Sequence, residues 1–201
     1  MLDDTIAAIA TPLGQGGLAV IRISGNKAVF VGDSLFIPLG KSKAKLAEVK
    51  THTLHYGHIA RNGYRLDEVI VSVMKAPATF TREDIVEISC HGGIRSTQEV
   101  LDAVLSAGAR LALPGEFTKR AFLHGRIDLA QAEAVADLIH ARTDLALSAA
   151  NEQLAGKLSQ RINMLRDDLM QVLAHIEAHI DFPDEDIEPD TVEGLARRLD
   201  E

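Results

Sequence analysis

The sequence predicts an α+β protein, with a mixed α/β part at residues 1–118 and an α-helical segment at residues 119–201. The first observation behind this prediction is a series of short β-type runs, separated by turn residues, that fills most of the chain before Pro114. The second is the absence of proline from residues 115–182, where apolar residues recur every three or four positions. The third is the composition, since 46% hydrophobic and 25% charged residues in 201 fit one large globular domain or two small ones.

The first part combines strands with two helices. A glycine-rich turn separates the first two strands, and Asn62-Gly63 between two alternating runs is a strong signal for a β-hairpin. The second helical run stops near Gly108. The predicted strands cover residues 5–10, 18–24, 51–60, 66–74 and 84–89, and the predicted helices cover residues 26–35 and 94–107.

The second part begins with a short helix predicted at residues 116–123. Asp128 is followed three residues later by Gln131, which is the capping-box pattern. A second helix is therefore expected to begin there and to reach about His140.

One long helix is predicted over residues 145–180, because its apolar residues fall on a single stripe that requires a packing partner. An acidic connector surrounds and follows Pro183. Residues 191–201 resemble the beginning of a further helix that continues past the end of this sequence, so we expect a longer parent protein.

The bulk composition excludes several classes of protein. With a formal net charge of -8, nucleic-acid binding would need a local basic face. The single cysteine, Cys90, excludes an internal disulfide and a multi-cysteine zinc site. The sequence shows neither a secretory signal nor a run of about 18 apolar residues, so a cytoplasmic protein without membrane contact is expected.

We interpret the short glycine-containing motifs as turns, not as binding sites. Gly14-Gln15-Gly16-Gly17 lies between strands, and we interpret it as a tight turn in preference to a ligand-binding loop. Two segments resemble the end of a phosphate-binding P-loop, but neither is one. Gly40-Lys41-Ser42 would need a glycine at position 35, where the residue is Leu35, and Gly156-Lys157 lies inside the helical stripe. No nucleoside-triphosphate site is expected.

The pair Cys90-His91 is not interpreted as catalytic, because neighbours on a strand point to opposite faces of the sheet. The glycines that follow, Gly92 and Gly93, suit a close backbone approach at the start of a helix. His175 and His179 share a helix face but have no third ligand, so no metal site is predicted. No catalytic residue is assigned.

The candidate binding residues are Arg22, Glu87 and Arg126. Arg22 and Glu87 each interrupt an apolar strand, so each charge requires a partner. They can pair with each other, or Glu87 can accept parallel N–H bonds from an aminopyrimidine such as a pterin. The sequence leaves both readings open. Arg126 follows Gly125 at a helix corner, where a solvated charge is favoured over a contact with an anionic ligand tail.

Four ordered blocks carry a resemblance to a known family. They are residues 10–25 (ATPLGQGGLAVIRISG), 80–93 (FTREDIVEISCHGG), 113–139 (LPGEFTKRAFLHGRIDLAQAEAVADLI) and 178–186 (AHIDFPDED). Together they resemble the tRNA-modifying GTPases called MnmE or TrmE, from about Asp4 to the end of the sequence.

The resemblance implies a ligand and partners. Residues 1–118 would be a folate-binding and dimerisation domain, similar to that of aminomethyltransferases, that holds 5-formyltetrahydrofolate or methylenetetrahydrofolate through Arg22, Glu87 and Arg126. The family acts as a homodimer with the flavoprotein MnmG and builds 5-carboxymethylaminomethyluridine at the tRNA wobble position. Its GTPase domain uses K⁺ and Mg²⁺ with GTP, and it is not found in this sequence, so no GTP hydrolysis is expected of this chain.

Two alternatives remain open at this point. The chain could be a stand-alone folate-dependent one-carbon transferase, which would need a general base in the pocket. It could also be a non-catalytic dimerisation and assembly module in which Arg22 and Glu87 form only an ion pair.

Overall fold

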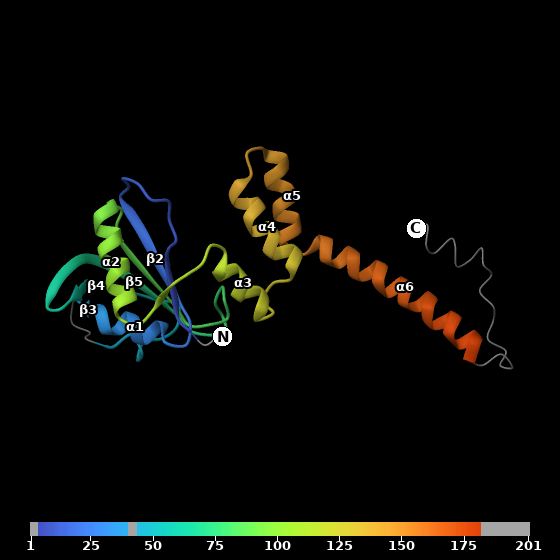
Figure 1. The fold of residues 1–201 in the computed structure, drawn as a ribbon, viewed down its shortest axis with the longest axis horizontal. Helices are drawn as coiled ribbons and strands as arrows, with labels where there is room; N and C mark the ends of the chain where they lie inside the picture. The colour runs from blue at the N-terminus through green and yellow to red at the C-terminus, as the bar shows by residue number, and fades with distance from the viewer. Residues whose placement is uncertain (1–3, 40–43, 182–201) are drawn as a thin grey trace. The chain divides into compact units, whose positions relative to one another are not determined.

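The computed structural model describes residues 4–39 and 44–181, and it divides the chain into two compact units (Figure 1). The units are Met1–Ile127 and Asp128–Glu201, so the division falls after the one expected between residues 118 and 119. The predicted acidic connector and the helix expected at residues 191–201 lie outside the described residues. No described helix is long and apolar enough to cross a membrane.

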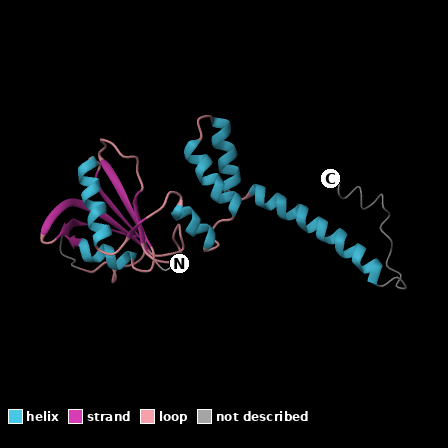
Figure 2. Cartoon of the chain, viewed as in Figure 1, coloured by secondary structure: helices cyan, strands magenta, loops and turns pink. Residues whose placement is uncertain are grey.

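The described part of the first unit is built on a β-sheet (Figure 2). The sheet has seven strands in the order β3-β4-β5-β6-β2-β1-β7. The pairs are antiparallel except β1 with β7, which is parallel. The strands are β1 Ile6–Ile9, β2 Leu18–Ser24, β3 Phe36–Pro38, β4 Thr53–Arg61, β5 Tyr64–Met74, β6 Ile85–His91 and β7 Arg110–Leu111. All five predicted strands are confirmed, whereas the short edge strands β3 and β7 are absent from the sequence prediction.

The hairpin predicted at Asn62-Gly63 joins β4 to β5. Both residues have positive φ, 53° for Asn62 and 80° for Gly63. Asparagine and glycine tolerate this left-handed backbone best, and the resulting turn matches the twist of the two strands. The sequence signal was therefore sufficient here.

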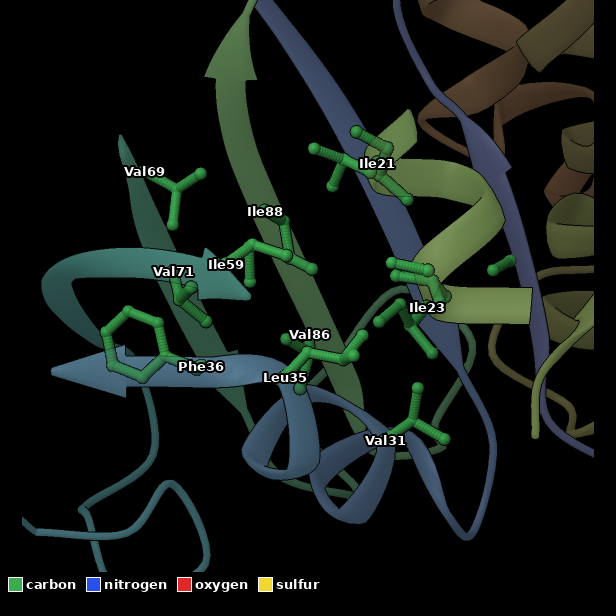
Figure 3. Packing of buried hydrophobic residues seen from close by; sticks show 14 of the residues in the cluster. Ile21, Ile23, Val31, Leu35, Phe36, Ile59, Val69, Val71, Val86 and Ile88 are labelled. Carbon is green, nitrogen blue, oxygen red and sulfur yellow. The ribbon is translucent and has the colours of Figure 1, made fainter. Parts of the chain in front are cut away.

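Two helices, α1 (Ala28–Leu35) and α2 (Ile94–Ser106), cover one face of the sheet and enclose the core. Alternate strand residues point toward them, among them Ile21 and Ile23 of β2 and Val86 and Ile88 of β6, all fully buried (Figure 3). The period of two along each strand leaves the remaining side chains on the opposite face, which we call the second face. That face carries Arg22 and Glu87.

The described helices outside this layer are α3 (Glu116–Leu123), α4 (Leu129–His140), α5 (Asp144–Leu154) and α6 (Lys157–Asp181). The helix α3 belongs to the first unit and the other three to the second. At the start of α4 the predicted capping box is present, with Asp128 accepting from the Gln131 backbone and Gln131 accepting from the Asp128 backbone.

The prediction of one helix over residues 145–180 was wrong, because α5 ends at Leu154 and α6 begins at Lys157. Gly156 between them has a φ of 85°, a left-handed conformation that ends helices. The apolar stripe is nevertheless real along α6, where its large apolar side chains are exposed in the described chain, for example Ile162 at 53% and Leu169 at 53%.

Candidate functional site

Arg22 and Glu87 occupy directly opposite positions on β2 and β6. The strand registers place Ala8 beside Arg22 and Ser72 beside Glu87, so the four residues form one row across the second face. The sequence reading expected Arg22 to face inward or reach a pocket. It lies on the face away from α1 and α2, with 30% of its side chain exposed, so it does not face the helix-side core.

The two side chains form an ion pair that uses only one carboxylate oxygen. The Arg22 Nε lies 2.8 Å and its Nη2 2.7 Å from the same Glu87 Oε1. No described residue donates to Oε2, although the Glu87 side chain is only 23% exposed. A two-oxygen acceptor used on one side only retains capacity for a further N–H donor. The ion-pair reading is therefore observed, and the ligand reading remains compatible with it.

Two aromatic rings, Phe80 and Phe117, flank the Arg22 guanidinium. The guanidinium carbon lies 5.8 Å from the Phe80 ring centre and 5.7 Å from the Phe117 ring centre. On the same Phe80 ring lies the guanidinium carbon of Arg126, at 4.9 Å. All three distances are in the range of cation–π attraction. The structure thus brings two of the three predicted residues together on one ring that the sequence reading had not selected.

A hollow of about 510 Å³ lies beside this ring. Its lining residues are Met74, Pro77, Ala78, Thr79, Phe80, Arg82 and Arg126. It therefore has an apolar wall, two guanidinium groups and no acidic lining residue. An opening of this kind suits a ligand with an apolar middle and an anionic end.

Arg120, which the sequence reading did not single out, anchors the loop and helix that frame the site. Its side chain is 2% exposed and donates to Asp4 Oδ1 at 2.6 Å, to Glu83 Oε1 at 2.9 Å and to Glu116 Oε1 at 3.3 Å. Glu83 in turn accepts from Ser24 Oγ at 2.7 Å on β2. These bonds tie the chain before β1, the loop that carries Phe80 and the helix that carries Phe117 to the sheet.

Glu116 gives this cluster a pH dependence that can be measured. Hydrogen bonds from Arg110, at 2.7 and 3.1 Å, are the main cause that lowers the pKa of Glu116 from 4.5 to about 2. A carboxyl group with a lower pKa in the folded state stabilises that state above its unfolded pKa, and this contribution is lost as the pH falls through the folded pKa. We expect the melting temperature to drop between pH 4.5 and pH 2, and circular dichroism melts will measure it.

The matched variants are Glu116→Gln, which should flatten that part of the pH profile, and Glu48→Gln. Glu48 is exposed and has no ion pair among the described residues, so its removal should leave the profile as in the wild type. Equal profiles for the wild type and Glu116→Gln would contradict the assignment.

The neighbouring Cys90-His91 motif has its two side chains on opposite faces of the sheet. Cys90 is fully buried in the helix-side core, and its burial is the main cause that raises the pKa of its thiol. The His91 ring points to the other side, where its Nδ1 lies 2.6 Å from Asp67 Oδ1. A Cβ added at Gly92 would lie 2.6 Å from the carbonyl oxygen of Gly16, so this glycine allows two backbone segments to approach each other. Among the described residues no group of histidine, cysteine or acidic side chains is arranged to hold a metal ion.

Fold and site together define a class of protein: an α+β domain with a hollow lined by two arginines, followed by a helical unit. The family model described as GTP-binding protein TrmE N-terminus matches residues 5–126, and the MnmE helical domain matches residues 129–201. The chain belongs to the TrmE/MnmE family.

The curated relatives named tRNA modification GTPase MnmE agree with this assignment. The proteins from Geobacillus thermodenitrificans, Bacillus velezensis and Bacillus subtilis are 56%, 53% and 52% identical to this chain over 199 residues. Each alignment covers 98% of this chain and 42% of the relative, so the chain spans less than half the length of these proteins.

Proposed function

We propose that this chain supplies the reduced-folate site and the self-association surface of a tRNA modification GTPase. The observation that carries the proposal is the Glu87 carboxylate, whose Oε1 is held by Arg22 while no described residue donates to its Oε2. A 2-aminopyrimidine ring offers neighbouring N–H donors in one plane, which is the geometry that a carboxylate accepts.

The residues present fit a folate. Glu87 would hold the pterin ring, while Arg126 would hold a carboxylate of the glutamate tail from its position beside the hollow. Arg22 would hold the Glu87 carboxylate in position through its two bonds to Oε1. When bound, 5-formyl- or methylenetetrahydrofolate would supply the one-carbon unit of the reaction.

In the whole protein, this site would serve the modification of the wobble uridine of tRNA to its 5-carboxymethylaminomethyl form. The partner would be the flavoprotein MnmG, and GTP hydrolysis with K⁺ and Mg²⁺ would take place in a domain absent from this sequence.

Formation of a homodimer is supported by apolar side chains exposed on the second face. These are Leu18 at 69%, Leu54 at 71%, Tyr56 at 53% and Ile70 at 43% exposure.

The test is a calorimetric titration of the purified chain with 5-formyltetrahydrofolate, with the mass of the same sample measured by sedimentation. We expect saturable binding to a species of twice the 21.7 kDa chain mass. Arg22→Ala should abolish measurable binding, whereas Arg61→Ala, which removes a half-exposed arginine paired with Glu99, should not. Absence of binding by a folded dimer would defeat the folate assignment and favour the assembly module.

A further inference from the structure

The Phe80 ring lies close to both arginines of the candidate site. It lines the hollow together with Arg126, whereas Arg22 and Glu87 do not line that hollow. The Arg22 guanidinium nevertheless contacts the same ring. The ring is thus the common neighbour of two guanidinium carbons, Arg22 at 5.8 Å and Arg126 at 4.9 Å from the ring centre.

We propose that Phe80 is a ligand-binding residue that selects for an aromatic or flat apolar middle segment between a hydrogen-bonding ring and an acidic tail. This inference rests on the proposed function, because it takes Glu87 and Arg126 as the two ends of one ligand. A ligand that reaches from Glu87 to Arg126 runs close to the Phe80 ring, because the ring neighbours both Arg126 and the Arg22 that pairs with Glu87. An aromatic linker stacks on phenylalanine with a gain beyond simple burial, whereas a flexible aliphatic linker lacks that gain.

The ring is held in a defined place. The neighbouring Thr79 hydroxyl donates to the Glu83 carbonyl at 2.7 Å, and the Thr81 carbonyl lies 2.6 Å from His124 Nδ1 on the corner after α3. Arg82 donates to the His124 carbonyl at 3.0 Å. Phe80 itself is half-buried. The residues on both sides of the ring are therefore fixed, and Phe80 lines the hollow without first having to be ordered.

The experiment compares three probes on one set of variants: 5-formyltetrahydrofolate, p-aminobenzoyl-glutamate and a methylated tetrahydropterin. The first contains all parts of a folate, the second only the aromatic middle and the acidic tail, and the third only the hydrogen-bonding ring. The variants are Phe80→Leu, which removes the aromatic ring at similar volume, and Phe80→Tyr, which keeps it. The matched control is Phe30→Leu on α1, where the ring is 69% exposed on the other side of the sheet. Thermal melts will establish that every variant is folded.

We expect Phe80→Leu to weaken binding of 5-formyltetrahydrofolate and of p-aminobenzoyl-glutamate by about 3- to 10-fold, the range of an aromatic contact. Binding of the tetrahydropterin should not change. Phe80→Tyr and Phe30→Leu should bind all three probes as the wild type does.

The outcomes separate this inference from the proposed function. If Phe80→Leu binds p-aminobenzoyl-glutamate like the wild type, or weakens the tetrahydropterin equally, the role of Phe80 is wrong even though the folate site stands. If the wild type binds p-aminobenzoyl-glutamate in a Phe80-dependent way but binds neither folate nor pterin, the folate assignment fails and Phe80 remains a contact for an aromatic acid. Binding of none of the three would overturn both.

Discussion

Replacing Arg120 with leucine is expected to lower the free energy of unfolding of the first unit by about 3–5 kcal/mol, the cost of removing one partner from a buried charge cluster. The substitution leaves Glu83, whose side chain is 11% exposed, without its arginine. It also removes the bonds to Asp4 and Glu116, although Arg110 continues to neutralise both of those carboxylates. The main penalty is therefore the uncompensated charge at Glu83, and urea unfolding followed by circular dichroism will measure it.

Arg95→Leu is the matched control, because Arg95 also forms an ion pair, 2.7 Å from Glu99, but its side chain is 86% exposed. Exposed pairs contribute about 0–1 kcal/mol, so this variant should stay close to the wild type. The double variant Arg120→Leu with Glu83→Gln should recover part of the lost stability, because the unpaired charge is then gone. Equal losses for Arg120→Leu and Arg95→Leu would show that the cluster is not the anchor inferred here.

The same substitution should affect the ligand site indirectly. Arg120 and Ser24 meet at Glu83, three residues after Phe80 in the chain, and Phe117 lies on the helix that carries Arg120. A looser cluster would therefore leave both rings less well placed around the Arg22 guanidinium. This is the physical link between the stability of the first unit and the geometry of its candidate site.

Much of the fold follows from local sequence signals. The hairpin at Asn62-Gly63 and the capping box at Asp128 depend on residues adjacent in the chain, and both were predicted correctly. The edge strands β3 and β7 have only 3 and 2 residues, too short to show a period. The break at Gly156 was missed because apolar residues keep their helical spacing across it. That spacing predicted a continuous helix in spite of the glycine.

The candidate site was predictable in part, for a related reason. A charge inside an apolar strand is a local anomaly, and it identified Arg22 and Glu87. Phe80 and Phe117 are ordinary aromatic residues in their own segments. Their place beside Arg22 depends on chain segments that are distant in the sequence, so no local pattern indicates it. Arg120 looked like one charge on an amphipathic helix, and only the fold shows that it is fully enclosed.

Replacing Glu87 with alanine is expected to weaken binding of 5-formyltetrahydrofolate by at least about 100-fold. The variant removes the acceptor for the N–H donors of the pterin ring, and hydrogen bonds to a charged group contribute about 1.5–3 kcal/mol each. It also leaves Arg22 facing those donors with no carboxylate between them, which adds repulsion between like donor groups. Isothermal titration calorimetry will measure the change.

The control for this prediction is Glu99→Ala, because Glu99 also pairs with an arginine, Arg61, at 3.1 Å, and its side chain is 30% exposed compared with 23% for Glu87. Its loss removes a comparable ion pair at a different position, so folate affinity should stay at the wild-type value. Glu87→Gln should fall between the two, because the amide retains one acceptor oxygen but presents a donor where the second oxygen was. If Glu87→Ala retains wild-type affinity, the carboxylate serves only to pair with Arg22, and the ion-pair interpretation of the site is the correct one.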